Sequence, residues 1–271
     1  MGSTKWEVGR KKAAIGPLGS ILLTMFTGLV QAVGRIKAFD KRPKGARMVV
    51  DPGDWAYAKK AKAGDSVSVS GCCLTLVRDP AKAKGLMEFD LVEETRRKTT
   101  FSSTWVGSKV NLEHAATAAT FLGGHLVQGH VDGIGGVNKV RKKDGDWRVW
   151  IGVGNHTGSL VSEPNLWRYL MPKGSVCVDG VSLTIAGLWA PDLRAGGKAT
   201  KNRKVHPIPP RPSGFWVALI PETLERTTLG ALRPGDTVNI EIDAVAKMVV
   251  RTAERMQAGS GGNAEIEIVR L

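Results

Sequence analysis

The chain contains an internal duplication, and this feature limits its possible folds more than any other. Residues 65–76 (DSVSVSGCCLTL) recur as residues 174–185 (GSVCVDGVSLTI). Further matches pair residues 107–113 (GSKVNLE) with 235–241 (GDTVNIE), 94–100 with 222–228 and, more faintly, 27–34 with 128–135. Since the blocks recur in the same order, the sequence predicts two related domains in tandem.

Each copy has the pattern of an all-β domain. Residues 66–70 and 238–242 alternate between polar and apolar side chains, which is the period of half-buried strands. Glycine-rich turns separate short segments of this kind. A copy of roughly a hundred residues built in this way fits a small closed antiparallel barrel, because closure removes exposed strand edges.

The second copy carries additional length. Gly71 and Gly180 lie 109 positions apart (180 minus 71), whereas Gly107 and Gly235 lie 128 apart (235 minus 107). The segment 191–214 accounts for the difference, and it is basic and rich in glycine and proline. These residues predict a surface insertion.

The segment 244–258 departs from the strand pattern. One side of a predicted helix carries apolar residues at the i, i+3 and i+4 spacing, namely Val245, Met248, Val249, Thr252 and Met256. The run Gly259-Ser-Gly-Gly then stops the helix. The apolar side either packs on its own barrel or contacts another subunit, and the pattern alone favours neither.

The chain has a formal net charge of +14, which raises the possibility of nucleic-acid binding. The basic residues gather in segments 1–24, 37–62, 139–148 and 190–214, which we expect to be a tail and loops. A surface that binds single-stranded nucleic acid would interleave aromatic residues with the basic ones so that bases can stack on them, and we do not expect such a surface in these segments. We therefore expect neither a nucleic-acid partner nor, without a long apolar run, a membrane partner.

Three cysteines without CxxC spacing predict neither a disulfide framework nor a zinc site. A cytoplasmic enzyme is therefore expected, or one of an organelle matrix if residues 1–24 are a targeting segment. Nucleotide-binding and metal-binding motifs are absent from the sequence, so we expect no cofactor and no metal.

Small polar side chains near predicted strand ends are the remaining candidates for chemistry: Ser66, Cys73 and Thr75 in the first copy, and His130, Asp179, Ser182 and Thr184 in the second. Each also has a purely structural interpretation. Cys73 can be a small buried apolar residue, and Asp179 can belong to an Asp-Gly turn.

Five blocks of the sequence together resemble the riboflavin synthase family: residues 25–31 (MFTGLVQ), 70–75 (SGCCLT), 123–132 (GGHLVQGHVD), 179–184 (DGVSLT) and 220–228 (IPETLERTT). The resemblance implies two six-stranded Greek-key barrels and a C-terminal helix that assembles a homotrimer. It also implies dismutation of two molecules of 6,7-dimethyl-8-ribityllumazine into riboflavin and 5-amino-6-(D-ribitylamino)uracil. Association with lumazine synthase is a further expectation.

With the resemblance, we expect these domains: an N-terminal extension (1–24), barrels at 25–121 and 122–243, the insertion (191–214), a helix (244–258) and a tail (259–271). In the family, each active site lies between the N-terminal barrel of one subunit and the C-terminal barrel of its neighbour.

The resemblance also carries over binding residues. The expected pocket of the N-terminal barrel comprises Phe26, Thr27, Gly28, Leu29, Val30, Ser66, Cys73, Leu74, Thr75 and a strand with Asp90, Leu91, Val92, Glu93, Glu94 and Thr95. The expected pocket of the C-terminal barrel comprises Gly129, His130, Val131, Lys173, Ser182, Leu183, Thr184 and a strand with Ala218, Leu219, Ile220, Pro221, Glu222 and Thr223.

The expected catalytic residues are His130, Cys73, Ser66, Ser182 and Asp243. We expect His130 to move protons, Ser182 and Thr184 to orient one ring, and Cys73 or Ser66 to stabilise or deliver a nucleophile to the other. A non-catalytic lumazine- or flavin-binding relative is the main alternative. A nucleic-acid-associated protein that has adopted the same fold is a third.

Overall fold

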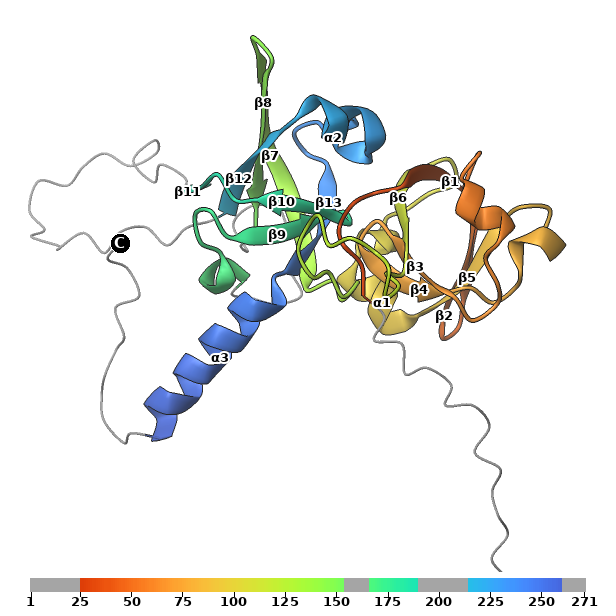
Figure 1. Ribbon diagram of the computed structural model, residues 1–271, viewed down its shortest axis with the longest axis horizontal. Helices are drawn as coiled ribbons and strands as arrows, with labels where there is room; N and C mark the ends of the chain where they lie inside the picture. Colours follow the sequence, from red (N-terminus) through yellow and green to blue (C-terminus); the bar gives the residue numbers. More distant parts are fainter. Residues whose placement is uncertain (1–24, 154–165, 190–213, 260–271) are drawn as a thin grey trace, which may run out of the picture.

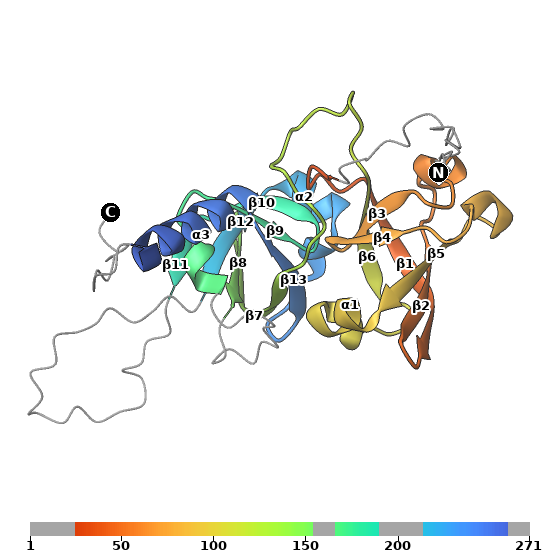
Figure 2. The same ribbon diagram turned by 90° about the horizontal axis from the view of Figure 1, so that it is seen from below.

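The chain forms two antiparallel β-sheets, one from each copy of the repeat (Figure 1). The computed structural model describes residues 25–153, 166–189 and 214–259. The two sheets lie side by side in both views, and a long helix projects from the second (Figures 1 and 2). The predicted all-β class with two tandem antiparallel domains is confirmed.

The N-terminal barrel contains six strands: β1 (Ala32–Arg42), β2 (Gly45–Asp51), β3 (Ser66–Val69), β4 (Cys72–Thr75), β5 (Met87–Val92) and β6 (Lys109–His114). Their spatial order is β4-β3-β6-β1-β2-β5. The two outer strands meet beyond the end of β4, where Leu76 forms an antiparallel bridge with Phe89. The Val77 N–H also donates to the Glu88 carbonyl at 3.0 Å. These contacts close the sheet into a barrel.

The C-terminal barrel contains seven strands: β7 (Gly133–Lys143), β8 (Asp146–Gly152), β9 (Ser175–Val178), β10 (Val181–Thr184), β11 (Gly187–Trp189), β12 (Gly214–Leu219) and β13 (Thr237–Ile242). Their order, β10-β9-β13-β7-β8-β12-β11, repeats that of the first barrel. The expectation of six strands is wrong here. The additional strand, β11, continues β10 after Ile185 and pairs with β12, so it replaces the single bridge at Leu76.

Short helices follow corresponding strands in the two barrels: α1 (Glu93–Lys98) follows β5 and α2 (Pro221–Arg226) follows β12. The expected strands 90–95 and 218–223 are therefore strand only up to Val92 and Leu219, respectively. Pro221 has no N–H for a strand ladder but fits the first turn of a helix. Single 3₁₀ turns lie at Ala56–Lys59, Pro80–Lys82, Thr100–Ser102, Leu166–Tyr169 and Thr228–Ala231.

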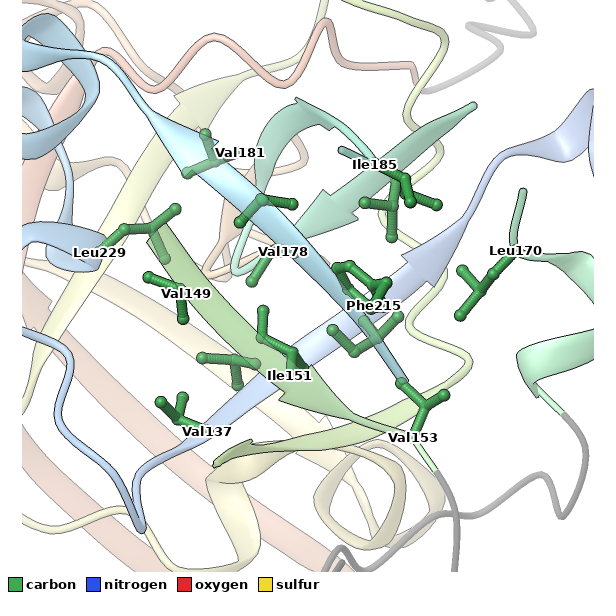
Figure 3. Packing of buried hydrophobic residues seen from close by; sticks show 14 of the residues in the cluster. Val137, Val149, Ile151, Val153, Leu170, Val178, Val181, Ile185, Phe215 and Leu229 are labelled. Atoms are coloured by element: carbon green, nitrogen blue, oxygen red, sulfur yellow. The ribbon is translucent and has the colours of Figure 1, made fainter. Parts of the chain in front are cut away.

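Apolar side chains fill the interior of each barrel. In the C-terminal barrel, Val149, Ile151 and Phe215 point inward and are buried (Figure 3). Trp150 and Trp216 occupy the alternate positions on the outer face, where their rings stack with centroids 5.9 Å apart. Since the interior is occupied by side chains, a small molecule would have to bind on the outside of the barrel.

Two asparagines join the barrels in a symmetric way. The side-chain amide of Asn111 donates to the carbonyl of Asp179 at 2.8 Å, and that of Asn239 donates to the carbonyl of Ser70 at 2.8 Å. Their side-chain oxygens accept from the backbone N–H groups of Thr228 and Thr100, both at 2.8 Å. The duplication is therefore also a structural pseudo-symmetry.

Two basic segments expected to be loops contain strands. Segment 37–62 contains most of the β1–β2 hairpin, and segment 139–148 forms the outer part of the β7–β8 hairpin. Aromatic rings lie beside the basic groups of the second hairpin, with the ammonium group of Lys142 3.8 Å from the ring centroid of Trp147. Cation–aromatic contacts of this kind keep lysine side chains on the outer face of a strand.

Helix α3 (Ala244–Gly259) coincides with the predicted helix apart from one additional residue. Its apolar side does not pack on its own barrel, because Val245, Met248, Val249 and Met256 are between 61 and 72 % exposed. In the described part of the chain, no helix is long and apolar enough to cross a membrane.

Three expected segments lie outside the described residues: the extension 1–24, all but Gly214 of the insertion 191–214, and the tail after Gly259.

Candidate functional site

Two short segments cross from one barrel to the other. We define strap 1 as residues 26–30 and strap 2 as residues 127–131. The carbonyl of Gly28 accepts the Ser182 N–H of β10 at 2.8 Å, and the carbonyl of Gly129 accepts the Cys73 N–H of β4 at 2.9 Å. Strands β4 and β10 are the outer strands of their sheets, so each strap satisfies a backbone donor that the sheet leaves unpaired.

Packing of the straps confirms that they cross. Val30 packs against the core of the C-terminal barrel, and Val131 packs against the core of the N-terminal barrel. The expected grouping, with residues 28–30 in the N-terminal pocket and 129–131 in the C-terminal pocket, is therefore wrong. The sequence shows which strand a strap precedes, but not which unpaired strand edge it reaches.

Glycine is required where each strap touches its strand. Gly28 and Gly129 have positive φ angles of 73° and 76°. A Cβ at Gly28 would lie 2.6 Å from the Cβ of Ser182, and one at Gly129 would lie 2.5 Å from the Cβ of Cys73. Any larger residue would push the strap away from the strand.

A buried carboxylate holds each strap. Glu113 of β6 accepts from the Thr27 N–H (2.7 Å), the Thr27 hydroxyl (2.8 Å) and the Gly28 N–H (3.1 Å). Glu241 of β13 accepts from the N–H groups of Gln128 (2.7 Å), Gly129 (2.9 Å) and His130 (3.1 Å).

Burial raises the pKa of both carboxyls, that of Glu241 to about 7, while the N–H donors oppose the shift. Sequence reasoning missed both residues. The signal was their matched position in the repeated block that ends Val-Asn-Leu/Ile-Glu.

These contacts define two candidate sites. Site N consists of strap 2, β4 and the β5–α1 junction, and site C consists of strap 1, β10 and the β12–α2 junction. At the two junctions Val92 and Ile220 expose apolar side chains, 62 % and 63 % exposed respectively. Such side chains can cover the face of a planar ring.

In site N, Ser66 and Cys73 interact across the β3–β4 pair. Burial raises the pKa of the Cys73 thiol, although the hydrogen bond with Ser66 lowers it in part. Cys73 is therefore a thiol at neutral pH, suited to donating a hydrogen bond rather than to attack as a thiolate. Its structural interpretation holds as well, since it packs against Phe26 and Val127. His130 is exposed on strap 2 beside this site.

In site C, Ser182 occupies the position that Cys73 occupies in site N. Its hydroxyl oxygen lies 2.7 Å from Nδ1 of His125 and accepts the backbone N–H of His125 at 3.3 Å. His125 was not among the expected site residues, although it belongs to the block 123–132. Asp243 immediately precedes α3 and accepts the Val245 N–H at 2.8 Å. Burial lowers the pKa of His125, and the negative charge of Asp243 opposes this shift in part.

The other expected site residues fall into two groups. The first is exposed and available to a ligand: Leu29, Thr75, Lys173, Thr184, Ala218 and Pro221. The second has other contacts in this structure. Leu74, Leu91 and Leu219 are buried in the barrel cores, and Leu183 packs against the C-terminal core.

Several expected polar residues are engaged in ion pairs or local hydrogen bonds. The guanidinium of Arg47 bonds both oxygens of Asp90, at 2.6 and 2.8 Å, and lowers the pKa of that carboxyl. In the two short helices, Glu93, Glu94 and Glu222 pair with Arg96, Lys98 and Arg226. The carbonyls of Thr95 and Thr223 accept from the hydroxyls of Thr99 and Thr227. The charges of these acidic residues are therefore paired with neighbouring basic side chains within the junctions.

Comparison with known proteins supports two tandem domains of one family. The family model of the lumazine binding domain matches residues 27–115 and 128–243. Riboflavin synthase of Escherichia coli K12 is 35% identical over 234 residues, which cover 86% of this chain and 94% of that protein. Riboflavin synthase of Mycobacterium tuberculosis is 36% identical over 227 residues, covering 84% and 97%.

Among solved structures, LumP complexed with riboflavin has a TM-score of 0.59 at 24% sequence identity, covering 80% of this chain and 98% of that one. LumP complexed with 6,7-dimethyl-8-(1'-D-ribityl) lumazine has a TM-score of 0.58 at 23% identity, with the same coverage. These structures establish likeness of fold. Together with the family match and the curated relatives, they show that the chain belongs to the riboflavin synthase family, with two lumazine-binding domains in tandem.

Proposed function

We propose that the chain catalyses the dismutation of two molecules of 6,7-dimethyl-8-ribityllumazine, with transfer of a four-carbon unit from one to the other. The products are riboflavin and 5-amino-6-(D-ribitylamino)uracil. The observation that carries the proposal is the presence of two matched sites, N and C, in a chain similar to riboflavin synthases over most of its length. A reaction between two copies of one molecule needs two such sites.

Fixing the two substrates in one relative orientation supplies much of the catalysis. Alignment of two reactants can lower a barrier by roughly 7–11 kcal/mol through entropy already removed on binding. The 7-methyl group of the lumazine readily loses a proton because the resulting anion delocalises into the ring. Modest acid–base assistance therefore suffices. Ser182 and Thr184 would orient one ring, Cys73 and Ser66 the other, and His130 would move protons between groups.

We also propose that site N of one subunit faces site C of a neighbour in a homotrimer. Support comes from the exposed apolar side of α3, which its own barrel leaves uncovered. A strip with Met248 and Val249 at its centre is an unusual surface for a chain that remains alone. Association with lumazine synthase would bring the supply of substrate close to these sites.

A reducing compartment, the cytoplasm or an organelle matrix, fits the chemistry. Cys72, Cys73 and Cys177 are all free thiols, which is usual for such compartments.

Incubating the purified protein with the lumazine alone tests the proposed function. Flavin fluorescence should appear, with one riboflavin formed for every two lumazines consumed, and a metal chelator should not abolish it. Tight binding of the lumazine without any turnover would refute catalysis. That outcome would instead support a non-catalytic lumazine- or flavin-binding protein, as the fold shared with LumP allows.

A further inference from the structure

The outer face of the C-terminal barrel carries basic and aromatic side chains next to one another. Side chains of a strand alternate between its two faces, so the neighbours of the inward-pointing Val149, Ile151 and Phe215 point outward. We call this surface the tryptophan face and define it by six residues of β7, β8, β11 and β12: Lys139, Arg141, Arg148, Trp150, Trp189 and Trp216. Figure 1 shows that the β7–β8 hairpin projects beyond the rest of this barrel.

Contacts within the face hold the cationic groups against the rings. The rings of Trp150 and Trp216 stack with centroids 5.9 Å apart. The ammonium group of Lys139 lies 5.0 Å from the ring centroid of Trp150, and the guanidinium carbon of Arg148 lies 4.9 Å from that of Trp216. A cation held in this way still has N–H groups that can bind an anion, and it loses less conformational freedom on binding.

Glycines allow two of the indoles to lie close to the sheet. A Cβ at Gly187 would lie 2.5 Å from Nε1 of Trp216, and one at Gly214 would lie 2.8 Å from Nε1 of Trp189. The indole N–H of Trp189 donates to the carbonyl of Ile151 at 3.2 Å. Both indoles are therefore half-buried across a neighbouring strand and belong to a fixed sheet surface.

The corresponding face of the N-terminal barrel has the opposite charge. The pairing registers of β1–β2–β5 and β7–β8–β12 match position by position. The counterparts of Lys139, Arg141, Arg148, Trp150, Trp216 and Ala218 are, in that order, Ala38, Asp40, Arg47, Val49, Glu88 and Asp90. These positions have a formal net charge of −2 in the N-terminal barrel (one Arg, two Asp, one Glu) and of +3 in the C-terminal barrel (one Lys, two Arg).

Ion pairs neutralise the basic side chains of the first face more completely than those of the second. Arg47 of the N-terminal barrel pairs with two carboxylates of the neighbouring strand β5. In the C-terminal barrel Arg148 pairs with Asp146 at 2.8 Å. Lys139 and Arg141 are exposed, and neither has a carboxylate partner among the residues that the structure describes. Since the first copy builds the same kind of barrel without a basic aromatic face, the fold does not require one.

We infer that the tryptophan face binds single-stranded nucleic acid. The phosphates contact Lys139, Arg141 and Arg148, and bases stack on the exposed parts of the indoles. The net charge of the face selects an anionic ligand, and the tryptophans favour one whose units also carry aromatic rings. Sequence analysis did not predict this surface, because Trp216 lies far from the basic segment 139–148 in the sequence and joins it only through strand pairing.

The fluorescence anisotropy of a labelled oligouridine of about 20 nucleotides measures binding to the chain. Lys139→Ala combined with Arg141→Asp gives these two positions the residues of the first copy. We expect the Kd to rise at least about 10-fold. The slope of log Kd against log salt concentration should fall by about 1.4, since each phosphate contact to a single strand contributes about 0.7.

The matched control is Lys59→Ala combined with Lys60→Asp, which removes the same charge from an exposed turn of the N-terminal barrel. The control should change the Kd less than about 3-fold. Equal weakening by the two double variants would overturn the inference, because only the overall charge of the chain would then matter. The inference is independent of the proposed function, and flavin formation should be unchanged in Lys139→Ala/Arg141→Asp.

Stacking is tested by Trp150→Leu, which keeps an apolar side chain on the face but removes the ring. The Kd should rise about 5- to 150-fold, the range for the loss of one base–ring stack, with the salt slope unchanged. Unfolding in urea shows whether the variant is folded. If it is not, quenching of the wild-type tryptophan fluorescence by oligouridine reports on stacking in its place. An unchanged Kd in the folded variant, or fluorescence that oligouridine does not quench, would overturn the inference.

An acidic protein segment is the competing ligand for a basic face. Unlabelled poly-L-glutamate of about 20 residues has a similar charge but no bases, so it should displace the labelled oligouridine only at concentrations at least about 10-fold higher than unlabelled oligouridine does. Displacement by both at equal concentrations would overturn the inference in favour of an acidic protein partner.

Discussion

Replacing Glu113 by Gln should weaken site C and spare site N, although Glu113 belongs to the N-terminal barrel. The reason is that Glu113 holds strap 1, which lies on β10 of the other barrel. Glutamine keeps one oxygen for the N–H and hydroxyl of Thr27. Its NH₂ group then faces the Gly28 N–H, which in the wild type has a carboxylate oxygen at 3.1 Å.

The size of the loss of binding at site C follows from one hydrogen-bond donor, the Gly28 N–H, which is left without an acceptor. A buried N–H without an acceptor costs about 1–3 kcal/mol, which corresponds to about a 5- to 150-fold smaller fraction of seated strap. The raised pKa of Glu113 favours the protonated carboxyl, but this does not remove the cost of the substitution. A protonated carboxyl can still accept the Gly28 N–H, whereas the NH₂ group of glutamine cannot.

Riboflavin binding to ¹³C-histidine-labelled protein measures both sites in one titration. His125 reports on site C and His130 on site N. In Glu113→Gln, the dissociation constant followed at His125 should rise within the stated range, while that at His130 should change less than about 2-fold. The matched variant Glu241→Gln should give the opposite pattern. If Glu113→Gln weakened only the binding seen at His130, the straps would not cross between barrels and the definition of both sites would fail.

Three further predictions follow from the structure. Met248→Lys combined with Val249→Lys should split the oligomer and reduce turnover, since two buried ammonium groups oppose association; a fully active monomer in sedimentation would contradict the trimeric site. Asn239→Leu should lower the free energy of unfolding, measured in urea, by at least about 2 kcal/mol, because the Thr100 N–H and the Ser70 carbonyl lose their hydrogen-bond partner. A loss below about 0.5 kcal/mol would refute the role of Asn239 in joining the barrels. Burial raises the pKa of Asp179 from 3.8 to about 7, so between these pH values the folded state binds a proton that the unfolded state has lost. The free energy of unfolding of the wild type should therefore fall, relative to that of Asp179→Asn, as pH rises across this window, by at most about 1.4 kcal/mol per pH unit. A difference between the two proteins that does not change with pH would contradict the shift.

The sequence predicted the features that depend on local pattern. Alternation and repeated blocks predicted two β-domains, and the i, i+3, i+4 spacing after Asp243 predicted α3 to within one residue. Matched polar positions such as Cys73 and Ser182 predicted corresponding places in the two domains. Each of these inferences uses residues close in sequence or related by a constant offset.

Features that depend on long-range contacts were not predicted. The exchange of straps depends on which outer strand carries an unpaired N–H, and this is decided only when both barrels have closed. His125 has no matched counterpart in the first copy, so the repeat gave no signal for it. Strand β11 arose because the second copy continues pairing after Ile185, where the first makes a single bridge.

The framework that holds the two straps is the same in both sites. The backbone contacts of the straps, the carboxylates of Glu113 and Glu241 and the asparagine exchange all obey the pseudo-symmetry. Two identical sites would bind two identical lumazines in the same way, and neither molecule would be marked as donor or acceptor of the four-carbon unit. In the proposed reaction the distinction must therefore come from the positions where the copies differ, which include Cys73 against Ser182 and the contact of Ser182 with His125.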